Sequence, residues 1–343
     1  MSRASLPHNR YEVARVDTAV TMRDYLIRRL ILIIPTFFLI TVISFSLIHL
    51  APGDPLAIMQ RRSKLTPEMR ELITRDLGLD QPLHIQYIKW LDGLFHGNLG
   101  YSYLERRPVF DIIGVRVPLT VELMLAAEII SVFLAVVLGV IAAVKHYSVY
   151  DAFSSLTALV GYSIPDFWLG LMLMLVFAVQ LKWLPIGGVG TVGIDFPTPI
   201  HALLDHIAHL ILPALTLVAV WTAYLFRMVR SAMLEVMTQD YITTARSKGL
   251  KEWVVIYKHA LRNALLPIVT YVGYSIGFLL SGAAIVETIF AWPGLGQLMV
   301  DRATVRDFPT LMGLSIVIAL MVLVANLASD IAYAAVDPRI RYD

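Results

Sequence analysis

Six long apolar runs divide this chain, and they limit its fold more than any other feature. A helix needs about 20 mostly apolar residues to cross the hydrocarbon core of a bilayer. The 343 residues are 57% hydrophobic and 16% charged, with a mean hydropathy of +0.70, which is too apolar for a soluble domain of that size. We therefore predict an all-α polytopic membrane protein that crosses the lipid bilayer six times. The predicted spans are Leu30–Leu50, Leu123–Val144, Phe153–Leu181, Ile207–Phe226, Leu265–Ile289 and Leu311–Val336.

Composition also excludes several classes of protein. The chain contains no cysteine, which rules out a disulfide framework and cysteine-ligated zinc or iron–sulfur sites. A net charge of +2 gives no indication of nucleic-acid binding, so we expect no nucleic-acid partner. The first apolar run is too long for the core of a cleavable signal peptide, and we expect it to remain as a membrane anchor.

The distribution of basic residues orients the predicted spans. Six spans place both termini on one side, together with the segment 227–263, which holds seven lysines and arginines against three acidic residues. Because lysine and arginine concentrate in cytoplasmic loops, we assign this side to the cytoplasm. Residues 1–22 are then a cytoplasmic extension and 23–343 the transmembrane domain, which includes a folded external loop at 51–118 and a cytoplasmic loop at 227–264.

The external loop carries helical patterns of its own. Proline near the start and glycine after the last turn are typical helix ends, and they predict a helix over Met69–Leu77 that ends at Gly78. A second apolar pattern covers Ile85–Leu94. We expect a small folded cap that contacts a partner outside the membrane.

The segment 240–267 is basic and helix-forming although it lies between two spans. Asp240 is placed to cap a short helix, Tyr241–Lys248, because an aspartate at this position accepts hydrogen bonds from the first free amides. Gly249 follows the last turn, where glycine adopts the left-handed conformation without a Cβ penalty. Two short helices hinged at a glycine indicate a docking device, and an ordinary positively charged loop is the alternative.

An enzymatic interpretation rests on one motif. Gly273, Ser275 and Gly277 match the G-x-S-x-G nucleophile elbow, which exposes its serine on a strand-to-helix turn. Here the motif lies inside an apolar span, where the same glycines form a G-x-x-x-G packing face. We favour helix packing, and an intramembrane hydrolase that uses Ser275 is the alternative.

Metal binding and nucleotide binding are both weakly supported. His201, His206 and His209 lie near Asp205, but without an H-E-x-x-H pattern we expect interfacial or bundle-facing histidines rather than metal ligands. The sequence contains no G-x-x-x-x-G-K-[ST] loop. If ATP drives this protein, the motor therefore lies on another polypeptide.

Ionisable and small residues at membrane depth are candidates for a transport path. Asp166 follows Pro165 in the third span, and a proline there frees backbone carbonyls that must face protein or a cavity. A proton-driven secondary transporter that uses Asp166 or Glu128 is a further alternative. We expect Asn326 and Asp330 to make bonds between helices. The candidate path residues are Asp166, Ser275, Ser281, Gly282 and Glu287.

Several stretches together resemble one known family. DYITTARSKGL at 240–250, followed by HALRNALLP at 259–267, is similar to the EAA loop of ABC-importer permeases, in the form of the dipeptide/oligopeptide (peptide/nickel) B-type subunit. Thr243 and Thr244 replace the name-giving Glu and first Ala, and Asp166 stands where a small or apolar residue is expected. The resemblance covers nearly everything after about residue 23. Further matching stretches are APGDP at 51–55, VPLTVEL at 117–123, SIPDFWLG at 163–170, VETIFAWPGLG at 286–296 and DPRIRY at 337–342.

The resemblance implies a way of working. The cytoplasmic loop would be a coupling helix in a groove of an ATPase subunit, with the small Ala245 entering the groove and Gly249 permitting the turn out of it. ATP and magnesium would bind to the partner ATPase subunits, and no cofactor is expected in this chain. The coupling residues are Thr243, Thr244, Ala245, Lys248, Gly249, His259 and Pro267.

The resemblance also implies the other components. The chain would be the permease subunit of an ATP-driven importer that moves di- or oligopeptides across a bacterial cytoplasmic (inner) membrane by alternating access. A homologous second permease, two cytoplasmic ATPase subunits and an extracytoplasmic peptide-binding protein would complete it. Nickel or another small solute is the alternative substrate, because nickel permeases share these motifs.

Overall fold

The computed structural model describes residues 22–50, 68, 71, 74, 75, 78–194, 196–279 and 282–336. Within these residues the chain forms helices and no strand, apart from an isolated bridge between Tyr101 and Pro108. The predicted all-α class is confirmed for this part. Predictions for residues 1–21, APGDP at 51–55, most of Met69–Leu77 and DPRIRY at 337–342 lie outside the described residues.

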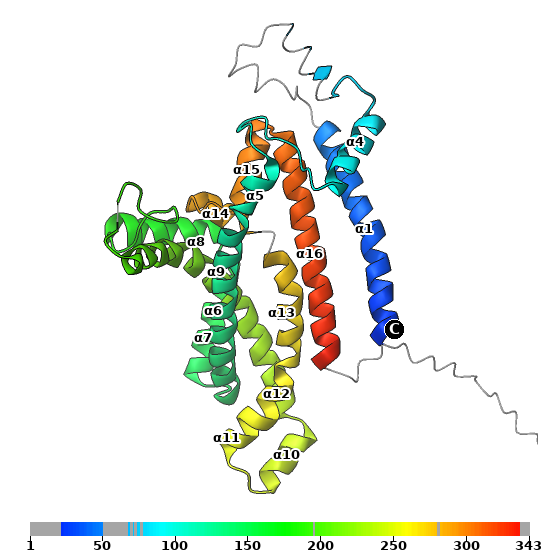
Figure 1. Ribbon diagram of the computed structural model, residues 1–343. Coiled ribbons are helices and arrows are strands. Elements are labelled where there is room, and N and C mark those ends of the chain that lie inside the picture. The colour runs from blue at the N-terminus through cyan, green and yellow to red at the C-terminus, as the bar shows by residue number, and fades with distance from the viewer. Residues whose placement is uncertain are drawn as a thin grey trace, which may run out of the picture.

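Long helices run side by side along one axis, with shorter helices at both ends (Figure 1). Two segments, η1 and η2, are π-helical. The elements are α1 (Met22–Leu50), α4 (Leu83–Phe95), α5 (Val109–Gly114), α6 (Val117–Val144), α7 (Val149–Ser163), α8 (Asp166–Leu173), η1 (Met174–Gln180), α9 (Pro199–Met237), α10 (Asp240–Ser247), α11 (Glu252–Val254), η2 (Val255–Ala260), α12 (Leu261–Ala264), α13 (Leu266–Leu279), α14 (Ala284–Ile289), α15 (Leu295–Val305) and α16 (Phe308–Val336).

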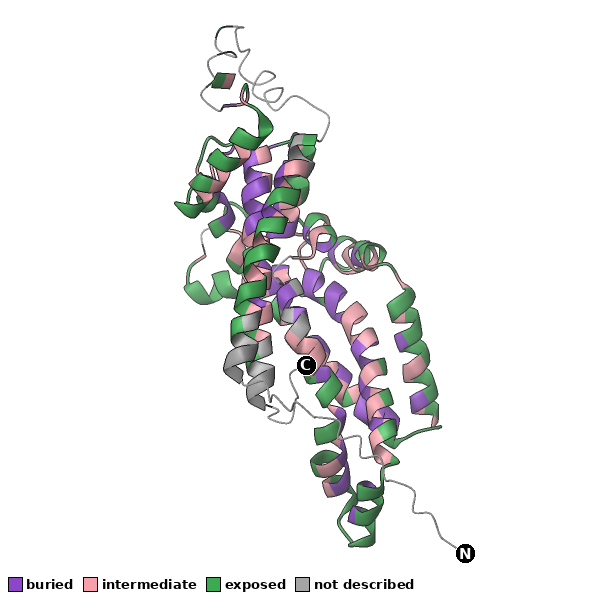
Figure 2. Cartoon of the chain, turned by 90° about the vertical axis from the view of Figure 1, so that its right-hand side faces the viewer, coloured by how far each residue is buried: buried purple, intermediate pink, exposed green. Residues whose placement is uncertain are grey.

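Helices α6 and α9 form the most extensive helix pair of the described chain. Gly139 on α6 allows their close approach, because a Cβ there would lie 2.9 Å from the Val229 side chain and 3.2 Å from the Phe226 carbonyl. Buried residues gather on the inward faces of the helices, whereas the outer faces are exposed (Figure 2). Apolar outward faces are what a bilayer solvates, so this distribution fits a membrane protein.

Helix α9 is much longer than the predicted span Ile207–Phe226. Its 39 residues extend over about 58 Å, whereas the hydrocarbon core is about 30 Å thick. Residues 227–237 therefore continue the helix beyond the predicted span, and the first part of the predicted segment 227–264 is helical.

The third predicted span, Phe153–Leu181, is not a straight helix. Its α7 and α8 parts meet at a bend of 102°, at Ile164 and Pro165. Proline lacks an amide hydrogen and biases the preceding residue toward extended backbone, which Ile164 adopts with ψ 128°. Asp166 therefore begins α8, at the break near the middle of the predicted span.

The fifth predicted span, Leu265–Ile289, is also interrupted. Helix α13 has 14 residues, about 21 Å, and is too short to cross the core alone. The chain then turns at Gly282, whose φ of +80° suits glycine, before α14 begins. Among the described residues, four helices are long and apolar enough to cross a membrane, or up to five if the bent α7–α8 pair counts as one span. Residues 280 and 281 of the fifth predicted span lie outside the described residues.

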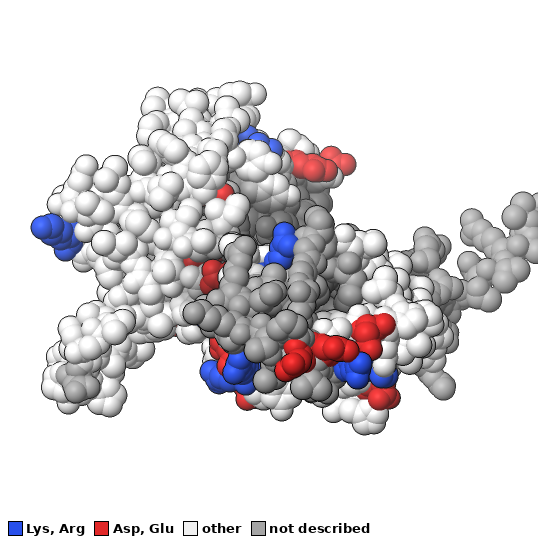
Figure 3. Space-filling model, turned by 90° about the horizontal axis from the view of Figure 1, so that it is seen from above, with Lys and Arg blue, Asp and Glu red and all other residues white. Residues whose placement is uncertain are grey.

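The loop that the sequence predicts to form an external cap is attached to the helices through Asp307, which is fully buried before α16. The Ser102 hydroxyl and the Tyr103 amide donate to its carboxylate over 2.5 and 2.9 Å. Burial, helped by this nearby carboxylate, raises the pKa of Tyr103 to about 12. Arg302 on α15 forms an ion pair with Glu105 of the same loop. Seen from above, charged side chains of both signs gather along one edge of this end (Figure 3).

The opposite end of the bundle is fixed by an ion pair between α7 and α9. The buried Asp151 carboxylate accepts from the Arg230 guanidinium over 2.6 and 2.8 Å, and lies 2.9 Å from His146 Nδ1. The Ser148 hydroxyl caps α7 by accepting from the Asp151 amide. These contacts hold the α6–α7 turn against the extended end of α9.

We expect Gly139→Leu to lower the stability of the protein by about 1–3 kcal/mol, since the added side chain meets Val229 and the α9 backbone. The midpoint of thermal unfolding in detergent measures this change. Gly273→Ala is the matched control, because a Cβ there would lie 3.7 Å from Ser329 Cβ, an ordinary contact. An unchanged midpoint for Gly139→Leu would contradict close packing of α6 on α9.

Candidate functional site

The segment from α10 to α12 projects beyond the ends of the long helices (Figure 1). Its own small core attaches it to the end of α9, where Met233 on α9 packs with Ile242, Val255 and Ile256. The remaining surface is largely exposed (Figure 2). A projecting, self-supporting pair of helical segments is suited to contact with another protein.

The first helix of this segment differs by one residue from the prediction. Gln239 occupies the N-cap, and Asp240 lies in the first turn without a capping hydrogen bond from its side chain. A carboxylate in the first turn is still favourable beside the helix dipole. Lys248 is the C-cap, and Gly249 has a φ of +74°, so the predicted left-handed glycine is confirmed.

Ala245 faces its own chain. It is 6% exposed and belongs to the small core that joins α10 to η2. In this structure its small size serves internal packing, whereas the resemblance implied that it enters a partner's groove. The exposed face of α10 consists of Tyr241, Thr243, Thr244, Arg246 and Ser247.

The turn after α10 is held by a charged pair. The Arg246 guanidinium donates to the Glu252 carboxylate over 2.8 Å, and this bond lowers the pKa of Glu252 from its usual value. Lys248 and Gly249 are exposed at the turn, His259 is half-buried on η2, and Pro267 is exposed at the start of α13. Five of the seven predicted coupling residues are thus exposed, whereas Ala245 is buried and His259 is half-buried.

A second candidate site is a cavity of about 420 Å³ among the helices. It lies where the two interrupted helices approach α6 and α9, because it is lined from α6, α8, α9, α13 and the turn before α14. Of the predicted path residues, Asp166, Ser275 and Gly282 line it, and Ser281 lies outside the described residues. The lining residues are Met124, Glu128, Asp166, Leu217, Trp221, Tyr271, Ser275, Leu279, Gly282 and Ala283.

The polar contacts of this cavity centre on Glu128. Its side chain is 4% exposed, and its Oε1 accepts from the Ser275 hydroxyl over 2.8 Å. Asp166, at the first position of α8, is half-buried and accepts from the Phe167 amide. The proline break places Asp166 at the wall of a cavity, which is where free backbone groups at membrane depth are tolerated.

Glu287 does not line this cavity. Its fully buried carboxylate accepts from the Thr120 hydroxyl over 3.1 Å and from the Gln297 amide over 2.8 Å. A Cβ at Gly294 would lie 2.5 Å from this carboxylate, and one at Gly282 would lie 2.8 Å from it. Glu287 therefore connects α14 to α6 and α15 across the break in the fifth predicted span.

The G-x-S-x-G motif lies within α13 and not on a strand-to-helix turn, so the hydrolase interpretation is wrong. Its glycines face α16 instead. The Ser329 hydroxyl donates to the Gly273 carbonyl over 2.5 Å, and a Cβ at Gly277 would lie 2.6 Å from Asn326 Oδ1. The predicted packing face is confirmed, and Ser275 points to α6.

The histidines near Asp205 bind protein groups. His206 Nε2 lies 2.8 Å from the Glu122 carboxylate, and His209 Nδ1 lies 2.8 Å from the Asp205 carbonyl. No group of three potential metal ligands occurs in the part of the chain that the structure describes. The expectation of bundle-facing histidines therefore holds for His206 and for His209, which is 5% exposed.

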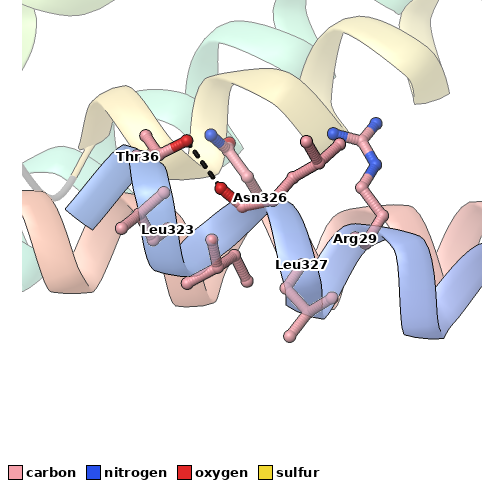
Figure 4. Close-up of a pocket in the computed structure, with 7 residues that line it drawn as sticks. Arg29, Thr36, Leu323, Asn326 and Leu327 are labelled. Atoms are coloured by element: carbon pink, nitrogen blue, oxygen red, sulfur yellow. Dashed lines mark hydrogen bonds between the residues drawn. The ribbon is translucent and has the colours of Figure 1, made fainter. Parts of the chain in front are cut away.

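A smaller cavity of about 210 Å³ lies between α1 and α16. Arg29 and Thr36 of α1 border it opposite Asn326 and Leu327 of α16 (Figure 4). The Thr36 hydroxyl donates to the Leu32 carbonyl of its own helix over 2.7 Å, so it is satisfied without a ligand. This groove lies between the two helices and shares no lining residue with the cavity at Glu128.

Sequence reasoning missed the aromatic wall of the larger cavity. Trp221 on α9 and Tyr271 on α13 line it, and the Tyr271 ring lies 5.4 Å from that of Tyr224. Both lie in apolar runs, where an aromatic residue is ordinarily a packing residue. Only the approach of α13 to α9 identifies them as lining residues.

Comparison with known proteins places the chain among transport proteins. The family model described as the binding-protein-dependent transport system inner membrane component matches residues 135–342, and the model of its N-terminal part matches residues 22–124. Over 94% of this chain and 100% of the relative, it is 44% identical to the oligopeptide transport system permease protein AppB of Bacillus subtilis (strain 168).

Two further relatives agree with these matches. The chain is 41% identical to the dipeptide transport system permease protein DppB of Escherichia coli (strain K12), over 94% of this chain and 99% of the relative. It is 40% identical to the glutathione transport system permease protein GsiC of Escherichia coli O6:H1, over 94% of this chain and 100% of the relative.

We expect Ala245→Leu to disrupt the small core of the α10–α12 segment, because a larger side chain cannot fit at a position that is 6% exposed. Limited proteolysis of the purified protein should cut faster within this segment. Thr244→Leu is the matched control, since Thr244 is exposed on the same helix. Equal cleavage of the two variants would contradict the inward position of Ala245.

Proposed function

This chain belongs to the family of binding-protein-dependent transport system inner membrane components, and we propose from that premise that it is the permease subunit of an ATP-driven importer of di- and oligopeptides. It is an integral membrane protein, a transport component and not an enzyme, and it works in a system with other components.

The projecting α10–α12 segment is the observation that carries this function. The sequence has no phosphate-binding loop of its own, so a chain that uses ATP must receive force from another subunit. Within this segment a small core joins α10 to η2, and the same core attaches both to α9. From there α9 continues as one helix to Trp221, which lines the cavity. A displacement of the segment can therefore be transmitted along α9 to the residues that line the cavity.

The proposed docking surface is the exposed face of α10 with the turn at Gly249. Thr243, Thr244 and Lys248 are exposed there, and the bond between Arg246 and Glu252 stiffens the turn. Ala245 supports this surface from behind. In this arrangement two cytoplasmic ATPase subunits bind the α10–α12 segments of this chain and of a homologous second permease, while ATP and magnesium stay on the ATPases.

The interrupted helices suit alternating access. Rigid-body switching needs elements that can change their relative angle while their own hydrogen bonds remain intact. The α7–α8 bend and the α13–α14 turn provide such joints beside the cavity. An extracytoplasmic binding protein would deliver substrate to the capped end of the bundle, opposite the α10–α12 segment. The membrane would be a bacterial inner membrane, with both termini of the chain in the cytoplasm.

Peptides are the substrate class that the relatives favour. The relatives named above are called oligopeptide, dipeptide and glutathione permeases. A cavity of about 420 Å³ is within the range of about 300–1,000 Å³ for sites that hold small molecules. In the described residues no group suited to a metal ion is present, so the structure gives no specific support to nickel as the substrate.

Substitutions at Gly249 test the coupling role. Gly249→Asp and Gly249→Val should abolish ATP-dependent peptide uptake while the chain still inserts. The β-branched valine costs about 1–2 kcal/mol at φ +74° and alters the turn, whereas aspartate places a negative charge on the docking surface. Gly249→Asn is the matched control, since asparagine tolerates this conformation and no atom lies within 4 Å of its Cβ position.

The measurement is uptake of a labelled dipeptide into proteoliposomes that contain the whole complex. Normal uptake by Gly249→Asp or Gly249→Val would contradict coupling through this turn. Uptake driven by an ion gradient alone, without ATP, would instead support the proton-driven alternative that uses Asp166 or Glu128.

A further inference from the structure

The charged side chains that line the cavity at Glu128 are all acidic among the described residues. Two carboxylates from different helices, Glu128 on α6 and Asp166 on α8, line it, and none of the ten described lining residues is lysine, arginine or histidine. Carboxylates at membrane depth are costly unless a cation or hydrogen-bond donors compensate them. Such a cavity is therefore suited to a ligand that brings positive charge.

The hydrogen bonding of Glu128 leaves one of its carboxylate oxygens available to a ligand. The residue is 4% exposed, yet among the described residues only Ser275 donates to it, and that bond goes to Oε1. No described residue donates to Oε2, and because Glu128 lines the cavity, a donor group of a ligand can reach this oxygen. The Ser275 hydroxyl fixes the orientation of the carboxylate and leaves the second oxygen available.

The aromatic wall supports the same kind of ligand. Trp221 and Tyr271 line the cavity with Glu128, and Tyr271 is held in place by the ring of Tyr224 at 5.4 Å. Aromatic faces attract a cation, and most strongly where water is excluded. A buried carboxylate beside two aromatic rings is a common way to bind an ammonium group.

We propose that Glu128, oriented by Ser275 and assisted by Asp166 and the rings of Trp221 and Tyr271, binds the amino-terminal ammonium group of the transported peptide. This inference rests on the proposed peptide import. Every di- or oligopeptide with a free amino terminus carries this group, whatever its side chains. A site for it therefore provides recognition of the substrate class while the rest of the cavity tolerates different side chains.

The test compares charge with hydrogen bonding at Glu128. Glu128→Gln keeps the size of the side chain and can still bond to Ser275, but it has no charge. Glu128→Asp keeps the charge on a shorter side chain. If the residue binds an ammonium group, Glu128→Gln should lower the initial rate of dipeptide uptake by about tenfold or more, and Glu128→Asp should retain more uptake than Glu128→Gln.

The matched control is Glu122→Gln, on the same helix. Glu122 bonds to His206 and does not line the cavity, so the same change of charge should alter uptake by about twofold at most. All variants are assayed as the whole complex in proteoliposomes, at equal amounts of inserted chain and with basal ATP hydrolysis measured in parallel.

A second peptide identifies the charge that is recognised. The test peptide is a dipeptide with an acetylated amino terminus that the wild-type complex also transports. For this peptide, the ratio of the Glu128→Gln uptake rate to the wild-type rate should be at least several-fold higher than for the free dipeptide, because no ammonium group is left to recognise. The binding protein is the same in both ratios, so its own preference cancels.

The outcomes separate the two proposals. Uptake by Glu128→Gln at or above that of Glu128→Asp, or equal losses for both peptides, would overturn the ammonium site and leave the importer function intact. Absence of ATP-dependent uptake of any dipeptide by the wild-type complex would overturn both.

Discussion

The absence of water from the bilayer core is the constraint on which this structure depends. Every backbone amide and carbonyl at that depth must be satisfied within the protein, so an interruption of a helix is tolerated only where protein or a cavity surrounds it. Within the described residues the predicted spans are interrupted at Pro165 and at Gly282, and residues beside both breaks line the same cavity. Both breaks thus border one cavity among the described apolar helices, which also holds the carboxylates of Glu128 and Asp166.

The two breaks are stabilised by different chemistry. At the first, proline has no amide hydrogen to leave unsatisfied, and Asp166 accepts the next amide of the chain. At the second, Glu287 accepts from Thr120 and from the Gln297 amide, with glycines leaving room for its carboxylate. Each break is therefore held by defined bonds, which lets helices meet at an angle without unfolding and fits a protein that alternates between two arrangements.

The sequence indicates the helical class, the apolar runs and the docking segment, because these depend on local composition and on caps such as Gly249. It does not indicate where a run is interrupted. Pro165 and Gly282 are both visible in the sequence, but proline and glycine also occur inside continuous spanning helices, as Pro213 does within α9. The sequence also does not indicate which way Ala245 faces, since a helical pattern is the same whether a small residue packs against its own chain or against a partner. Glu128 is visible as an ionisable residue, but only the approach of α13 pairs it with Ser275.

The central claim is that the exposed face of α10, and not Ala245, receives the motor subunit. Because the chain has no cysteine, single cysteines can be placed at Thr244 and at Ala245 and tested for site-specific cross-linking to the co-purified ATPase. Efficient cross-linking from Thr244→Cys with little from Ala245→Cys is the expected result. Cross-linking from Ala245→Cys alone, or none from either position in a complex that hydrolyses ATP, would contradict it.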